Sequence, residues 1–140
     1  MNKVARILVT VLGLMSAAQS AQAGDRDEFA IMWMGKINEG VALSQADDLI
    51  LEIAEVVSEN NGTLAFEISR VGDQLFGYER FSDLQGLMAQ MEIVGPLYPQ
   101  IGATWSTVTV VPTTEVSVEI SELLKGYNAL VPDSFARASR

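Results

Sequence analysis

The residue best suited to acid–base chemistry in this chain is Glu79, an acid inside the largely apolar segment Leu75–Phe81. This segment is expected to be a strand, so Glu79 shares one face with Gly77 and Phe81. A carboxylate on an apolar face needs hydrogen bonds or a nearby cation. The polar groups expected within reach belong to the preceding strand and the following helix: Arg70, Glu67 and Gln90. Glu79 is therefore either a general base with a raised pKa or a structural carboxylate held by neighbouring polar groups.

Four aromatic residues are candidates for ligand contacts. Trp33 and Trp105 have flat rings that suit stacking against an aromatic ligand. The alternative is that both are ordinary core or interface residues. Tyr78 and Tyr98 offer hydroxyl groups to a substrate, or else satisfy a buried partner.

Composition excludes several classes of site. The chain contains no histidine and no cysteine, so histidine-containing zinc sites, Ser-His-Asp triads, a haem-ligating histidine and disulfides are excluded. No metal and no cofactor is expected. The formal charge of −9 repels phosphate backbones, which argues against nucleic acid as a partner.

The first 23 residues have the pattern of a secretory signal peptide. Lys3 and Arg6 precede an apolar run from Ile7 to Met15, and Ala21-Gln22-Ala23 forms a cleavage site before Gly24. The run is too short for a membrane span, which takes about 20 apolar residues. We therefore expect a periplasmic or secreted mature chain with no membrane span. Loss of the two basic residues leaves seven basic and 18 acidic residues, a formal charge of −11.

Hydrophobic patterning predicts the elements of the mature chain. Strands are expected at 29–37, 63–71, 75–81 and 105–111, since these segments are rich in apolar residues or alternate with period two. One amphipathic helix is expected after an N-cap at Ser44, with Leu49, Ile50, Ile53, Val56 and Val57 as its buried stripe. A second is expected after Ser82 or Asp83, with Leu84, Leu87, Met88 and Met91 buried, and a short third helix over about 121–130.

This order predicts an α+β fold of the ferredoxin-like β-α-β-β-α-β type, with both helices on one face of an antiparallel sheet. We divide the chain into a signal peptide (1–23), this domain (24–112) and a C-terminal extension with a short helix (113–140). Apolar side chains also lie on the other sheet face, among them Met32 and Met34. Such a face needs a cover, so we expect a homodimer with sheet facing sheet. The rival cover is the C-terminal segment 121–140.

The segment 61–91 resembles one known family. Asn61-Gly62-Thr63-Leu64-Ala65-Phe66-Glu67, followed by Tyr78-Glu79-Arg80-Phe81-Ser82-Asp83 and a helix, is similar to the antibiotic-biosynthesis monooxygenase (ABM) domain family, which includes quinol monooxygenase-like proteins. The resemblance implies a dimeric α+β barrel with a pocket in each protomer between sheet and helices. It also implies a substrate-binding position at Gln90, where many members carry a histidine on the second helix.

Two functions follow from different classes. The first, implied by the resemblance, is an exported cofactor-independent monooxygenase acting on small quinol or phenolic compounds, with Glu79 as the catalytic residue. Trp33, Tyr78, Gln90 and Trp105 would then contact a small aromatic substrate. The alternative is a non-catalytic periplasmic module of the same fold that binds a small ligand or a partner protein. A closed apolar cavity beside Glu79 and Trp33 would favour the first function, and a packed, solid interior the second.

Overall fold

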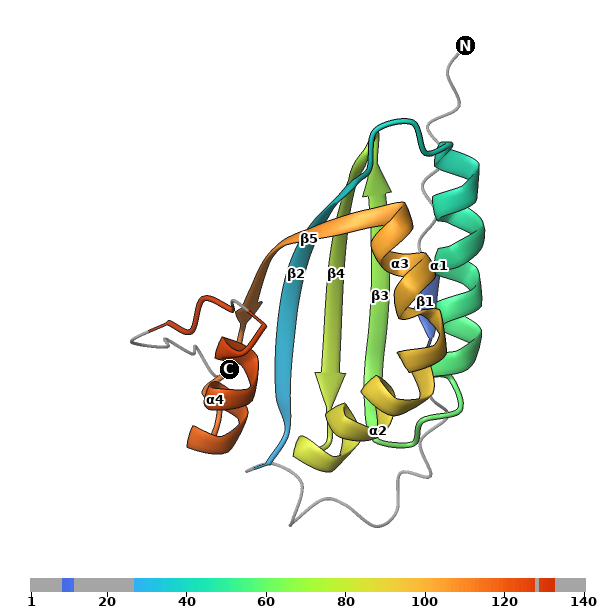
Figure 1. The fold of residues 1–140 in the computed structure, drawn as a ribbon. Helices are drawn as coiled ribbons and strands as arrows, with labels where there is room; N and C mark the ends of the chain where they lie inside the picture. The colour runs from blue at the N-terminus through green and yellow to red at the C-terminus, as the bar shows by residue number, and fades with distance from the viewer. Residues whose placement is uncertain (1–8, 12–26, 128, 133–140) are drawn as a thin grey trace, which may run out of the picture.

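The computed structural model describes residues 9–11, 27–127 and 129–132. Its central element is an antiparallel sheet in the order β1-β3-β4-β2-β5 (Figure 1). Four strands form the predicted ferredoxin-like arrangement: β2 (Phe29–Ile37), β3 (Thr63–Val71), β4 (Gln74–Phe81) and β5 (Trp105–Pro112). The predicted α+β, ferredoxin-like fold is confirmed. Within the described part of one chain the sheet is open, with β1 and β5 at its edges.

A short strand, β1 (Val9–Val11), pairs with β3 at one edge of the sheet. It lies inside the predicted signal peptide, whose other residues, 1–8 and 12–23, are outside the described residues. Export and cleavage stay predictions. No helix among the described residues is long and apolar enough to cross a membrane.

The helices α1 (Leu43–Val57), α2 (Leu84–Val94) and α3 (Tyr98–Thr104) cover one face of the sheet (Figure 1). A 3-10 turn, η2 (Gly95–Leu97), joins α2 to α3. The main core contains the buried side of α1 and its partners Phe66, Ile68 and Leu75 from the sheet. Of the two caps predicted for α2, Asp83 is the one used: its side chain accepts a hydrogen bond from the Gly86 amide at 2.8 Å.

Two details of the helix predictions are wrong. The first helix begins at Leu43, and its N-cap is Ala42, which makes no side-chain hydrogen bond, so Ser44 is not the cap. On α2, Met88 is 45% exposed, while Gln90 lies on the buried side with Leu87 and Val94. The buried stripe is therefore rotated from the predicted one, and it carries an amide.

The C-terminal helix, α4, spans Val118–Lys125 instead of the predicted 121–130. It begins earlier because the Ser117 side chain caps it, accepting from the Ile120 amide. Ile120 and Leu124 belong to a second apolar cluster, whose other buried members are Phe29, Ile31, Phe81 and Leu87. These partners face the helical side of the sheet, and the Leu130 amide bonds to the Val110 carbonyl at 2.8 Å. The described part of the C-terminal segment therefore does not cover the opposite face, where Met32 and Met34 are 47% and 43% exposed.

Candidate active site

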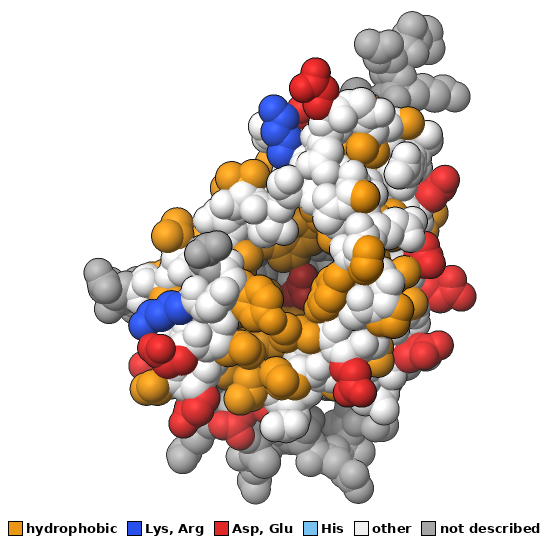
Figure 2. All heavy atoms as spheres, in the orientation of Figure 1, with side chains coloured by type: hydrophobic (Ala, Val, Ile, Leu, Met, Phe, Trp, Pro, Cys, Tyr) orange, Lys and Arg blue, Asp and Glu red, His pale blue; other side chains and the backbone are white. Residues whose placement is uncertain are grey.

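A cavity of about 430 Å³ lies between the sheet and the helices α2, α3 and α4. Figure 2 shows it as a hollow lined by hydrophobic side chains, with an acidic side chain at its floor. Its volume is within the roughly 300–1,000 Å³ of small-molecule sites. The polar side chains of its lining are few: Glu79, Gln90, Tyr98, Thr107 and Tyr127. The interior beside Glu79 and Trp33 is therefore hollow, which is the arrangement that favours a ligand site.

Glu79 is the acid at this cavity, and its carboxylate is held by two neutral donors. The side chain is only 8% exposed. Oε1 accepts a hydrogen bond from Trp33 Nε1 at 2.7 Å, and Oε2 accepts one from Gln90 Nε2 at 2.5 Å. Burial raises the pKa of Glu79 above its ordinary value, and the two hydrogen bonds oppose part of that rise. A buried carboxylate with a raised pKa is the form of acid that suits proton transfer near neutral pH.

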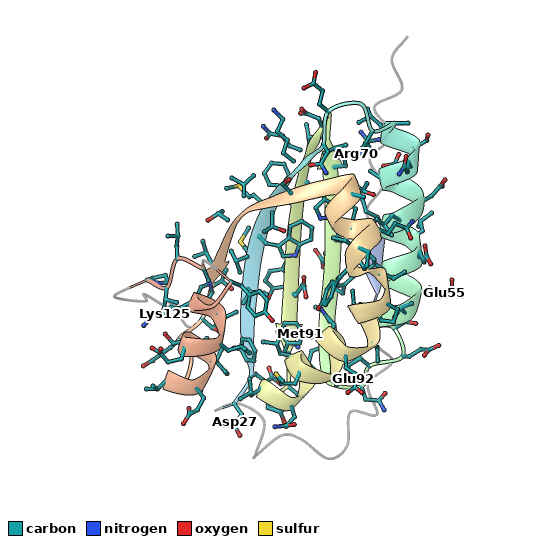
Figure 3. All side chains as sticks on the ribbon, viewed as in Figure 1. Asp27, Glu55, Arg70, Met91, Glu92 and Lys125 are labelled. Atoms are coloured by element: carbon teal, nitrogen blue, oxygen red, sulfur yellow. The ribbon has the colours of Figure 1, made fainter. Side chains whose placement is uncertain are left out.

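Arg70 does not balance the charge of Glu79, contrary to the sequence prediction. It lies at the end of the sheet near the start of α1 (Figure 3) and pairs there with Asp47, with Nε–Oδ1 at 2.6 Å and Nη2–Oδ2 at 2.9 Å. Phe66 is the residue of β3 opposite Glu79, so Arg70 is displaced by four residues, or about 13 Å along a strand. Glu67, the other predicted neighbour on β3, is opposite Tyr78 on the other face.

Trp33 reaches Glu79 because β4 has a glycine where the indole ring must lie. Trp33 on β2 is paired with Gly77 on β4, two residues before Glu79. A Cβ atom at position 77 would overlap the indole atoms Cε2 and Nε1. The ring therefore lies directly over Gly77, which brings its N–H to the carboxylate. The sequence indicated a stacking or core role for Trp33 and did not indicate this hydrogen bond.

The structure brings four of the five predicted site residues together. Trp33, Glu79, Gln90 and Trp105 all line the cavity. Tyr78 is not in its lining, because side chains alternate along a strand and Tyr78 faces the opposite side from Glu79. Its cross-strand neighbour there is Met32.

Residues from α3, from α4 and from the turn that follows α4 complete the wall of the cavity. Tyr98 was a candidate from the sequence, but Tyr127, Leu123 and Leu124 were not. Burial raises the pKa of Tyr98, and the nearby Tyr127 and Glu79 raise it further. On α2, Met91 lines the cavity, while the next residue, Glu92, is exposed (Figure 3). In the sequence, only the position of Leu123 and Leu124 as adjacent apolar residues on a short predicted helix indicated that they would be buried.

Comparison with known proteins gives a fold relationship. No protein-family model matches the sequence, and no curated protein matches it. Among solved structures, the chain is similar to MupZ from Pseudomonas fluorescens, with a TM-score of 0.69 and 22% identity over 81% of this chain and 95% of that chain. It is also similar to SnoaB, a cofactor-independent oxygenase from Streptomyces nogalater, with a TM-score of 0.55 and 11% identity over 66% and 96% of the two chains. A third similar structure is protein YJCS, with a TM-score of 0.55 and 11% identity over 64% and 99%.

The chain shares the fold of these three structures. The α+β protomer fold that the resemblance of residues 61–91 implied is therefore confirmed, with the open four-stranded unit β3-β4-β2-β5 and its helices on one face, while the dimeric barrel stays a prediction. At these sequence identities the likeness concerns the fold alone.

Proposed function

We propose that this protein is a cofactor-independent monooxygenase that acts on small quinol or phenolic compounds in the cavity beside Glu79. The observation that carries the proposal is the buried Glu79 carboxylate, which stands in an apolar cavity of ligand size and is held by two neutral donors. The fold shared with SnoaB, a cofactor-independent oxygenase, supports the same reaction class.

The lining of the cavity suits a neutral aromatic substrate. Among its described lining residues there is no lysine and no arginine, and Glu79 is the acidic member. A substrate carrying a carboxylate or phosphate would therefore enter without a counter-charge and opposite an existing anion. A weakly acidic hydroxyl group on a flat ring instead gives Glu79 a proton to take, while Trp33 and Trp105 offer apolar ring surfaces.

The reaction balances for a phenol that carries hydrogen at its para carbon. Glu79 takes the hydroxyl proton, and the phenolate passes one electron to dioxygen, which gives a phenoxyl radical and superoxide. The two radicals combine into a C–O bond at the para carbon, and protonated Glu79 returns its proton to the peroxide. The carbon then loses its hydrogen as a proton while the O–O bond breaks. The products are a quinone and water, and the substrate supplies all four electrons.

Oxygen uptake with a panel of phenols and hydroquinones tests this proposal. The wild-type protein should consume oxygen in proportion to quinone formed, and Glu79→Gln should lose at least about 100-fold in kcat, the range of general base catalysis. Glu92→Gln is the matched control, since Glu92 is exposed on the outer side of α2, and it should keep wild-type activity.

Two outcomes would contradict the proposal. A folded Glu79→Gln variant with full activity would remove Glu79 from the reaction. Inactivity of the wild-type protein across the panel, together with saturable quenching of tryptophan fluorescence by the same compounds, would indicate the non-catalytic binding module.

A further inference from the structure

A chain of hydrogen bonds runs from the backbone to the carboxylate of Glu79, and it starts at Asn60. The Asn60 Nδ2 group donates to the Gly86 carbonyl at 2.8 Å, and Oδ1 accepts from the Gly62 amide at 3.1 Å. A backbone carbonyl can only accept, and a backbone amide can only donate. These two contacts therefore fix which end of the Asn60 amide is which.

The direction of the next two bonds follows from that anchor. Asn60 Nδ2 also donates to Thr63 Oγ1 at 2.8 Å, so the Thr63 hydroxyl is an acceptor in that bond. Its own proton is then free to be donated to Gln90 Oε1, which lies 2.7 Å away. With its oxygen engaged by Thr63, Gln90 must turn its nitrogen toward Glu79.

The hydrogen-bond chain is buried, so reversing the donor–acceptor direction of its bonds would be costly. Thr63 and Gln90 are each 7% exposed and Glu79 is 8% exposed. If the Gln90 amide turned over, its oxygen would face the carboxylate oxygen, and two acceptors would meet without a proton in a site poor in water. The close packing of Gly62 against Gly86 holds the start of β3 against α2, since a Cβ on either glycine would overlap the other's backbone.

We propose that Thr63 is a positioning residue for Glu79: its hydroxyl, directed by Asn60, holds the Gln90 amide with the nitrogen toward the carboxylate and so favours the ionised acid. This inference rests on the proposed role of Glu79 as a base, which requires the ionised form. Thr63 does not line the cavity, so it acts through Gln90.

Few other groups influence the ionisation of Glu79. On the paired strands its neighbours are Ile31 of β2 and Phe66 of β3, which do not titrate. Gln90 faces it from α2. Tyr98 on α3 and Tyr127 in the turn after α4 are the other titratable groups among the described cavity residues. Burial raises the pKa of Tyr98, so this phenol stays neutral through the range in which a carboxylic acid titrates, and neither tyrosine is altered in a Thr63 variant. A change in the titration of Glu79 on mutation of Thr63 is therefore attributable to the hydrogen-bond chain.

NMR titration of the resting protein tests the inference without any substrate. The Trp33 indole N–H signal, assigned by comparison with Trp105→Phe, reports the ionisation of Glu79 through their hydrogen bond. Thr63→Val, which keeps the shape and removes the hydroxyl, should move the midpoint of this titration to higher pH. Thr63→Ser, which keeps the hydroxyl, should leave the midpoint at the wild-type value.

A double-mutant cycle separates positioning from general destabilisation. Gln90→Met should also raise the midpoint, and Thr63→Val should add nothing in that background, because Thr63 acts only through Gln90. A wild-type midpoint in Thr63→Val, or additive shifts in the double variant, would overturn the inference. If Thr63→Val does not fold, the wild-type protein still tests the inference. The Gln90 side-chain N–H signals should then titrate with the same midpoint as the Trp33 signal, and their failure to do so would refute the proposed hydrogen-bond chain.

Oxygen uptake adds a second readout. In Thr63→Val the acidic limb of the pH–rate profile should move to higher pH, in the same direction as the NMR midpoint, with Thr63→Ser unchanged. Absence of oxygenase activity in every variant, with the NMR shifts as expected, would remove the proposed function and leave the positioning role of Thr63 intact.

Discussion

Substitution of Gly77 by alanine should disrupt the site through one methyl group. The added Cβ would overlap the indole ring of Trp33, and β4 cannot move away because β2 and β3 are paired with it on both sides. The ring must therefore be displaced, which breaks the 2.7 Å hydrogen bond to Glu79.

The magnitude has two parts. Overpacking of a filled core costs about 1–3 kcal/mol, and loss of a hydrogen bond to a charged group costs about 1.5–3 kcal/mol. We therefore expect Gly77→Ala to lower the free energy of unfolding by about 2–5 kcal/mol, somewhat less than the sum of the two terms because they overlap partly. At about 4 °C per kcal/mol for a domain of this size, Tm should fall by roughly 8–20 °C.

Urea denaturation and thermal unfolding followed by circular dichroism measure this change. Gly102→Ala is the matched control, because Gly102 is an exposed residue of α3 and a Cβ there meets nothing within 4 Å. It should be neutral or stabilise the protein by up to about 1 kcal/mol. Adding Trp33→Leu to Gly77→Ala should recover part of the loss by making room for the methyl group. A Gly77→Ala protein within about 1 kcal/mol of wild type and with an unchanged Trp33 indole N–H signal would refute the reasoning.

Three further predictions concern pH, assembly and processing. Because the pKa of Glu79 is raised in the folded state, the folded protein retains a proton that the unfolded chain releases. The free energy of unfolding should therefore fall as pH rises from 4.5 through the raised pKa. Denaturation midpoints measured between about pH 4 and 8 should show this fall in the wild-type protein and lack it in Glu79→Gln. The exposed face with Met32 and Met34 predicts a homodimer, which light scattering should detect. Met34→Glu should raise the dimer dissociation constant at least about tenfold, while Leu51→Glu on α1 should leave it unchanged. A wild-type monomer at micromolar concentration would contradict this prediction. Intact mass of protein from the periplasmic fraction should correspond to a chain beginning at Gly24, and a mass that retains residues 1–23 would show that the leader is not removed.

Local pattern in the sequence was sufficient for most of the fold. The bounds predicted for the strands Phe29–Ile37 and Thr63–Val71 agree with the structure, because alternation along a strand and runs of apolar residues are properties of neighbouring positions. The same alternation placed Glu79 on the face of Gly77 and Phe81, which is the buried face. The start of α4 was mispredicted because Ser117 and Ser121 are both plausible caps, and the contacts of Ile120 with the sheet select the first.

The partners of Glu79 were decided by tertiary structure. Gln90 was within predicted reach, but Arg70 was excluded by the strand register, which places it opposite Leu75. Trp33 became a hydrogen-bond donor because the register of β2 against β4 sets its ring over Gly77, a pairing between residues 44 positions apart in the chain. Tyr127 joined the cavity through the packing of α4. Secondary structure depends on neighbours in sequence, whereas a site depends on which distant side chains meet, and strand register and helix packing determine that only once the chain is folded.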